Sequence, residues 1–302
     1  MQSVFIRMAL PALLCSTMAV PVGAMGATGA VGAEPIRIFI AGDSTASHYS
    51  EQVYPRMGWG QVLERQLQPG AAVQVVNLAQ PGRSSRSFIS EGWFARIQGQ
   101  IRAGDYLLIQ FGHNDEKCGE DPPRPPPARD QADFAKLCTY PGVDAQHADG
   151  VSFAATLARY IDMARTVGAT PVLITPVTRR AFRNGRLEAQ THHKTKGKFP
   201  GDYSQTVRDT AQRHQVPLID LDVRSVAFFN QVGEVASLDY FLAVDPERYP
   251  YYRTEQGSRS NPDNTHFQER GAVAMSELVV QGLRDLKLPL AEQFVQGTTA
   301  QP

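Results

Sequence analysis

Short apolar runs recur along the chain and alternate with segments whose apolar residues return every three or four positions. The runs are rich in Val, Ile and Leu and lack a clean alternation of apolar and polar residues, which is typical of strands buried on both faces of a sheet. We therefore predict five strands, at residues 36–41, 73–79, 106–111, 171–177 and 216–221.

The intervening segments predict helices that cover this sheet. In the clearest of them, Phe153, Leu157, Tyr160 and Ile161 fall on one helical face. Alternating strands and helices predict an α/β fold, a three-layer α/β/α sandwich around a five-stranded parallel sheet in flavodoxin-like order. The predicted helices cover residues 59–67, 151–167, 203–214 and 267–286.

The N-terminus has the pattern of a secretory signal peptide. Arg7 precedes an apolar stretch over residues 8–22, and small residues follow. We predict a signal peptide over residues 1–24 and cleavage after Ala24, with export to the periplasm or the cell exterior. An uncleaved anchor is the alternative, but two prolines interrupt the run and it is short for a membrane span. Other cleavage sites that fit are those after Ala27 and Ala33.

Composition sets the size and the class of the mature protein. The chain has 302 residues, 42% of them hydrophobic and 20% charged, with a formal net charge of +0. These values are typical of a globular protein and give no support for a nucleic-acid partner or, after signal cleavage, for a membrane surface. Because we find no internal repeat and no change of composition, we expect one domain over residues 34–290.

Two cysteines, Cys118 and Cys138, remain after the signal peptide is removed. In an exported chain a pair of this kind favours a disulfide, and two free thiols are the alternative. The two cysteines bracket a Pro-rich stretch at residues 120–136, which a bridge would hold. The mature chain has no CxxC motif and no cluster of His and Cys residues, so we expect neither a metal nor a cofactor.

Polar residues follow several predicted strands, where ligands bind in sheets of this type. The first strand ends at Gly-Asp-Ser44, which is either a plain turn or a nucleophile at the rim of the sheet. A serine nucleophile needs a base and an orienting acid. Asp263 precedes His266 by three positions, so the carboxylate can bind Nδ1 and leave Nε2 for the serine. A helix cap formed by Asp263 and Asn264 explains the same residues.

Four blocks follow one another along the chain: GDS at 42–44, Gly82, GHND at 112–115 and DxxH at 263–266. Their identity and order resemble those of the SGNH (GDSL-type) hydrolases, and the residues around them are similar to those of rhamnogalacturonan acetylesterases. The resemblance implies that Ser44 is the nucleophile, His266 the general base and Asp263 its orienting acid. It also implies an oxyanion hole made of the backbone N–H groups of Ser44 and Gly82 and the side-chain amide of Asn114. The matching segments are AGDST at 41–45, GWG at 58–60, GRSS at 82–85, QFGHND at 110–115, TPV at 175–177 and DNTHF at 263–267.

The resemblance predicts a serine esterase that removes acetyl groups from a plant cell-wall polysaccharide, here rhamnogalacturonan, through an acyl-enzyme. Alternatives are an esterase acting on xylan, one acting on a lipid or thioester, and a carbohydrate-binding protein without catalysis. Four arginines either meet the carboxylates of a galacturonate-containing polymer or are ordinary surface charges. They are Arg83, Arg86, Arg179 and Arg180.

Overall fold

The first apolar run forms strand β1 (Ile36–Gly42), whose side chains alternate between two hydrophobic cores. Ile38 and Ile40 belong to one core, and Phe39 and Ala41 belong to the other. Since successive side chains of a strand point to opposite faces, both faces of the sheet are covered. All four residues are fully buried, which is why the run shows no polar alternation.

This computed structural model describes residues 1–2, 34–118, 136–188 and 191–296. The predicted signal peptide, apart from its first two residues, and residues 120–135 of the Pro-rich stretch lie outside the described residues. The described residues from Pro35 onward belong to one compact unit. Its packing continues past residue 290, because Phe294 is buried in the same core as Ile38.

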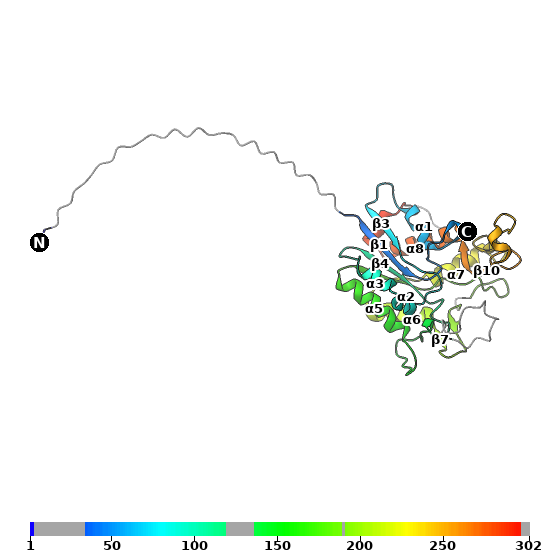
Figure 1. Ribbon diagram of the computed structural model, residues 1–302, viewed down its shortest axis with the longest axis horizontal. Coiled ribbons are helices and arrows are strands. Elements are labelled where there is room, and N and C mark those ends of the chain that lie inside the picture. Colours follow the sequence, from blue (N-terminus) through cyan, green and yellow to red (C-terminus); the bar gives the residue numbers. More distant parts are fainter. Residues whose placement is uncertain (3–33, 119–135, 189–190, 297–302) are drawn as a thin grey trace, which may run out of the picture. The chain divides into compact units, whose positions relative to one another are not determined.

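Five parallel strands form the main sheet, and Figure 1 shows three of them, β3, β1 and β4, side by side. The register places Ile38 of β1 opposite Val75 of β3 and Tyr106 of β4. The order β3–β1–β4–β5–β8 is the flavodoxin-like order, so the predicted sheet is confirmed. The other strands of this sheet are β3 (Val73–Asn77), β4 (Tyr106–Gln110), β5 (Thr170–Ile174) and β8 (Leu218–Ile219).

Helices cover both faces of the sheet, which confirms the predicted three layers. The core that contains Ile38 is completed by α1 (Trp59–Val62), α7 (Leu221–Val232) and α8 (Glu269–Asp285). The core that contains Phe39 is completed by α2 (Ser85–Ser90), α3 (Trp93–Gln98), α5 (Phe153–Thr166) and α6 (Tyr203–His214). Across the described ranges, no helix has the length and apolar content needed to cross a membrane.

Side-chain caps fix where three of the helices begin. Ser152, Asp202 and Asp220 each accept a hydrogen bond from the backbone N–H three residues later, at the start of α5, α6 and α7 respectively. The cap at Asp220 also ends the last strand early. The predicted strand at 216–221 therefore ends at Ile219, and only Leu218 and Ile219 pair with β5.

The largest departure from the predicted elements lies near the C-terminus. The helix predicted at 267–286 begins only at Glu269, because residues 263–268 form a strand, β10 (Asp263–Gln268). This strand pairs in antiparallel fashion with β2 (Arg56–Met57) and β9 (Phe241–Leu242). Phe267 is fully buried opposite Met57 and Phe241, so distant partners decide the structure of this segment.

The remaining elements are short. The helix predicted at 59–67 is split into α1 and a 3₁₀ turn, Leu63–Gln66. Two-residue strands β6 (His193–Lys194) and β7 (Gly201–Asp202) pair with each other. Further 3₁₀ turns are η1 (Glu51–Val53), η3 (Ala236–Asp239), η4 (Pro250–Arg253) and η5 (Pro289–Gln293).

Candidate active site

Ser44 lies in the turn that follows β1, and its Oγ is 2.8 Å from Nε2 of His266. The turn is held by Asp43, whose carboxylate accepts hydrogen bonds from the N–H and the Oγ1 of Thr45 at 2.9 and 2.8 Å. Ser47 Oγ donates to the carbonyl of Asp43 at 2.7 Å. The side chain of Asp43 therefore braces the turn while that of Ser44 faces the imidazole.

His266 is oriented by Asp263, as its Nδ1 lies 2.6 Å from Oδ2 of that carboxylate. The other oxygen, Oδ1, accepts the backbone N–H groups of Thr265 and His266 at 2.9 and 3.1 Å. With Nδ1–H donating to Asp263, Nε2 of the neutral imidazole is free to accept from the Ser44 hydroxyl. Asp263 thus binds its own strand and the imidazole, and does not cap a helix as the alternative interpretation had it.

Burial and charge leave Asp263 ionised and His266 neutral at neutral pH. Burial alone would raise the pKa of Asp263, but the hydrogen bond and charge of His266 and the two backbone N–H groups hold that pKa well below its usual range. Burial lowers the pKa of His266, and the neighbouring Asp263 opposes this only in part. Asp263 is therefore ionised and His266 neutral, which is the state that can accept a proton.

Gly82 and Asn114 follow β3 and β4, the two strands beside β1. Gly82 has φ +77°, a conformation that favours glycine, and an added Cβ would meet no atom within 4 Å, so the space beside it is open. Asn114 Nδ2 donates to the carbonyl of Arg83 at 3.0 Å, while its Oδ1 accepts from Lys117 Nζ at 2.7 Å. These bonds turn the amide nitrogen toward the segment that contains Gly82, and one of its two N–H groups remains for a ligand.

The segment that carries Asn114 is fixed on both sides by buried side chains. His113 Nδ1 lies 3.0 Å from Oδ2 of Asp43, which joins this segment to the Ser44 turn. Burial lowers the pKa of His113 to about 4, although Asp43 opposes the shift, so the ring is neutral. On the other side, the Asp115 carboxylate accepts from Ser85 Oγ at 2.6 Å. Burial raises the pKa of Asp115 to about 7.

The two cysteines lie just beyond this segment. Their sulfur atoms are 2.16 Å apart and their Cα atoms 4.8 Å apart, which is disulfide distance. Next to Cys138, Thr139 donates from Oγ1 to the Asp115 carboxylate at 3.1 Å. A bridge between Cys118 and Cys138 would therefore tie down the stretch that positions Asn114.

The four arginines predicted to meet substrate carboxylates all have partners within the protein. Arg83 pairs with Glu91 at 2.7 Å, and Arg179 pairs with the buried Glu116. Their role toward substrate stays a prediction, while their observed contacts hold loops in place. Arg86 donates to the carbonyl of Cys138, and Arg180 donates to Ser237 Oγ, the carbonyl of Glu234 and Oδ1 of Asn264.

Several residues around Ser44 were missed by the sequence analysis. Tyr49 donates its hydroxyl hydrogen to the carbonyl of Ser44 at 2.8 Å, and Lys117 fixes the amide of Asn114. Glu116, the partner of Arg179, has its second carboxylate oxygen 3.2 Å from Nδ1 of the buried His192. No motif marks these positions, because each acts on an atom that only the folded chain brings near.

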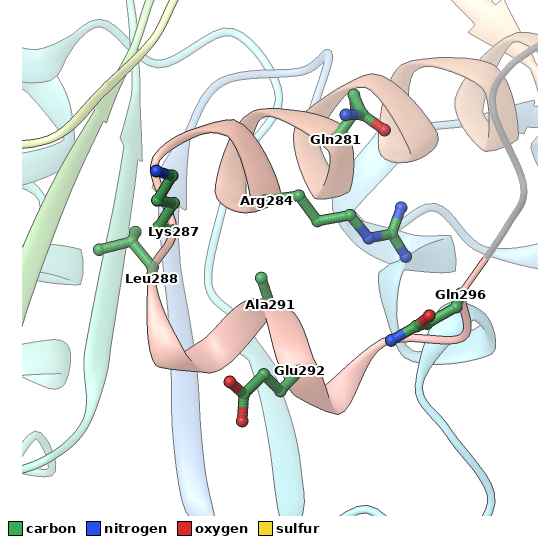
Figure 2. Close-up of a pocket in the computed structure, with 7 residues that line it drawn as sticks. All are labelled: Gln281, Arg284, Lys287, Leu288, Ala291, Glu292 and Gln296. Atoms are coloured by element: carbon green, nitrogen blue, oxygen red, sulfur yellow. The ribbon is translucent and has the colours of Figure 1, made fainter.

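The described residues hold no cluster suited to a metal, and a surface cavity lies away from Ser44. No group of three or more His, Cys, Asp or Glu side chains in these ranges could hold a metal ion. A surface cavity of about 450 Å³ lies between the end of α8 and η5 (Figure 2). Since α8 has 17 residues and is about 25 Å long, this cavity is far from His266, which precedes the other end of the helix. Its residue Arg284 donates to the carbonyl of Val295.

The fold and the site together point to one class, an α/β/α hydrolase: Ser44, Gly82 and Asn114 follow β1, β3 and β4, and β10 brings His266 to Ser44. The chain belongs to the GDSL-like lipase/acylhydrolase family, whose model matches residues 40–274. It is a carboxylic ester hydrolase, as the resemblance of its motifs predicted.

Named relatives cover most of the chain. It is 34% identical over 263 residues to the rhamnogalacturonan acetylesterase RhgT of Bacillus subtilis (strain 168), which covers 87% of this chain and 95% of the relative. It is also 34% identical over 259 residues to YesY of the same organism, named a probable rhamnogalacturonan acetylesterase, covering 86% of this chain and 97% of the relative. These identities confirm the predicted resemblance.

A solved structure supports the fold alone. The crystal structure of the Bacillus subtilis protein YxiM superposes with a TM-score of 0.57 at 24% identity. The match covers 84% of this chain but only 58% of that one.

Proposed function

We propose that this protein is a serine esterase that removes acetyl groups from rhamnogalacturonan, with Ser44 as the nucleophile, His266 as the general base and Asp263 as the orienting acid. The observation that carries the proposal is the unbroken chain of contacts from Ser44 Oγ to His266 (2.8 Å) and from His266 to Asp263 (2.6 Å). The substrate is suggested by the names of the two relatives at 34% identity.

In the first half of the reaction, Ser44 Oγ attacks the carbonyl carbon of the acetyl group while Nε2 of His266 takes the hydroxyl proton. The carbonyl oxygen becomes negative and accepts hydrogen bonds from the backbone N–H groups of Ser44 and Gly82 and from Nδ2 of Asn114. His266 then gives its proton to the sugar oxygen, the C–O bond breaks, and the sugar alcohol leaves. Asp263 stabilises the imidazolium that exists between these steps.

In the second half, water replaces the sugar. His266 takes a proton from the water as its oxygen attacks the acetyl-Ser44 ester, and the same three donors hold the negative oxygen. Return of the proton to Ser44 Oγ releases acetic acid and restores the starting state. The lowered pKa of His266 supports this role, because the imidazole is neutral when the reaction begins.

We also propose that the protein is exported and that Cys118 and Cys138 are oxidised in the mature form. The sulfur-to-sulfur distance supports the bridge, and an oxidising compartment is where such a bridge persists. The acetylated polysaccharide substrate is then met outside the cytoplasm, by a mature chain without its signal peptide.

The test is acetate release from acetylated rhamnogalacturonan, acetylated xylan and p-nitrophenyl acetate, together with hydrolysis of long-chain acyl esters. We expect release from rhamnogalacturonan and p-nitrophenyl acetate and loss of both in Ser44→Ala. Activity only on long acyl chains would favour a lipase, and faster release from xylan would change the substrate. A serine-directed phosphonate should add its mass to the Ser44 peptide. An adduct on another serine would reject the proposed nucleophile.

A further inference from the structure

Arg56 lies on the same face of a small sheet as His266, although the two are far apart in the sequence. In the antiparallel pair of β2 and β10, Arg56 is opposite Gln268 and Met57 is opposite Phe267. Met57 and Phe267 are buried in the core, so the neighbouring side chains point the other way. His266 and Arg56 are then diagonal cross-strand neighbours, a relationship that separates residues by about 7–8 Å.

The guanidinium of Arg56 is held against an aromatic ring beside Ser44. Its central carbon lies 4.7 Å from the centre of the Tyr49 ring, and Tyr49 in turn bonds the carbonyl of Ser44. Stacking of this kind orients the planar guanidinium. Burial lowers the pKa of His266, and the positive charge of Arg56 acts in the same direction, which is consistent with their proximity.

Among the described residues, Arg56 has no acidic partner within ion-pair distance, unlike Arg83 and Arg179. Throughout the described ranges, no Asp or Glu side chain forms an ion pair with it, and its Nε is buried without a hydrogen-bond partner. In contrast, Arg83 is paired with Glu91 and Arg179 with Glu116. Arg180 donates three hydrogen bonds to oxygens of the protein. A half-buried cation without an anion is costly, and a bound anion would remove that cost.

We propose that Arg56 binds the carboxylate of a uronic acid unit in the sugar chain and so selects acidic over neutral polysaccharides. The choice of ligand rests on the proposed function, since rhamnogalacturonan contains galacturonate. Arginine suits this ligand because its planar fork pairs with a carboxylate through two parallel hydrogen bonds. A neutral glycan such as xylan without uronic acid side groups offers no such partner. Arg56 is therefore a specificity residue, and the acetyl transfer itself stays with Ser44 and His266.

The test measures binding, so that it does not depend on hydrolysis. Isothermal titration calorimetry compares the wild type, Arg56→Gln and Arg56→Lys with two ligands: a galacturonate oligosaccharide without acetyl groups and the same oligosaccharide with its carboxylates reduced to alcohols. We expect the wild type to prefer the acidic ligand. In Arg56→Gln, affinity for that ligand should fall by about 10- to 100-fold, the size expected for one charge-assisted pair, and Lys should restore part of it.

Arg213→Gln is the matched control, because it removes the same charge at a different place on the surface. Arg213 lies in the last turn of α6, where its side chain pairs with Asp144. This variant should bind both ligands as the wild type does. Equal wild-type affinity for the acidic and reduced ligands, or an equal loss for both in Arg56→Gln, would overturn the proposal. Acetate release is measured in parallel on the acetylated polymer. If the charge preference holds but no acetate appears, the esterase proposal fails and the carboxylate site stands.

Discussion

Ser44 Oγ and His266 Nε2 lie 2.8 Å apart although 222 positions separate the two residues in the chain. One belongs to the turn after β1 in the main sheet, and the other belongs to β10 in the small antiparallel sheet. The contact therefore joins the beginning and the end of the folded unit. A proton can pass along it, which is the physical requirement for an activated serine.

Replacing Ser44 with Ala should lower kcat for acetate release by about 10⁴- to 10⁶-fold, because the nucleophile is removed while the fold is kept. The measurement is p-nitrophenyl acetate hydrolysis, with circular dichroism melting to check folding. Ser50→Ala is the control, since Ser50 is an exposed serine that makes no capping bond. A Ser44→Ala variant that kept more than a tenth of the wild-type rate would point to another nucleophile.

Asp263→Asn should lower kcat by about 10³- to 10⁴-fold. The amide cannot stabilise the imidazolium by charge, and its NH₂ group can turn the ring of His266 to the wrong tautomer. Asp162→Asn, an exposed acid on α5, is the matched control. The rates are measured at saturating substrate, and unchanged kcat in Asp263→Asn would show that this carboxylate does not orient the base.

The acid limb of kcat/KM should have its midpoint below pH 6.5, the usual pKa of histidine. Burial lowers the pKa of His266, so the ring stays neutral to lower pH, and activity falls only as pH drops through that lowered value and the base becomes protonated. Because Asp263 raises this pKa, the residual activity of Asp263→Asn should have its midpoint at still lower pH. A midpoint above 6.5 would mean that the charge of Asp263 outweighs the effect of burial.

Asn114→Ala should lower kcat by about 10²- to 10³-fold with little change in KM, because one donor to the oxyanion is lost and the ground-state ester uses it less. Lys117→Met should cause a smaller loss of the same kind, since Lys117 only fixes the orientation of the amide. Steady-state kinetics on p-nitrophenyl acetate separate kcat from KM. A rise in KM at constant kcat would assign Asn114 to substrate binding.

Cys118→Ser together with Cys138→Ser should lower the free energy of unfolding by about 3 kcal/mol, the chain-entropy value for a loop of this length, here a separation of 20 residues. Urea unfolding of the purified mature protein measures the change, and adding a reductant to the wild type should mimic it. Thiol titration of the denatured wild type should find no free thiol. Two titratable thiols would contradict the bridge.

The sequence by itself determined the main sheet, most of the helices on it and which polar residues follow the strand ends. Runs such as Ile38-Phe39-Ile40-Ala41 are apolar throughout because both faces are covered, so local pattern was enough to find them. Asp263 and His266 are three positions apart, and a hydrogen bond at that spacing is a local property of the chain.

Only the tertiary structure decided what depends on distant partners. The local pattern placed the start of a helix at Phe267, but residues 263–268 form a strand. The reason is that β2 and β9 supply hydrogen bonds to this segment and apolar neighbours for Phe267. Four arginines close to the motifs are engaged by protein atoms, while Arg56, which no motif marked, forms no ion pair with any acid in the part of the chain that the structure describes. Local patterns record the neighbours of a residue along the chain, whereas the partner of a charge is set by which strands pair, and pairing is a property of the whole fold.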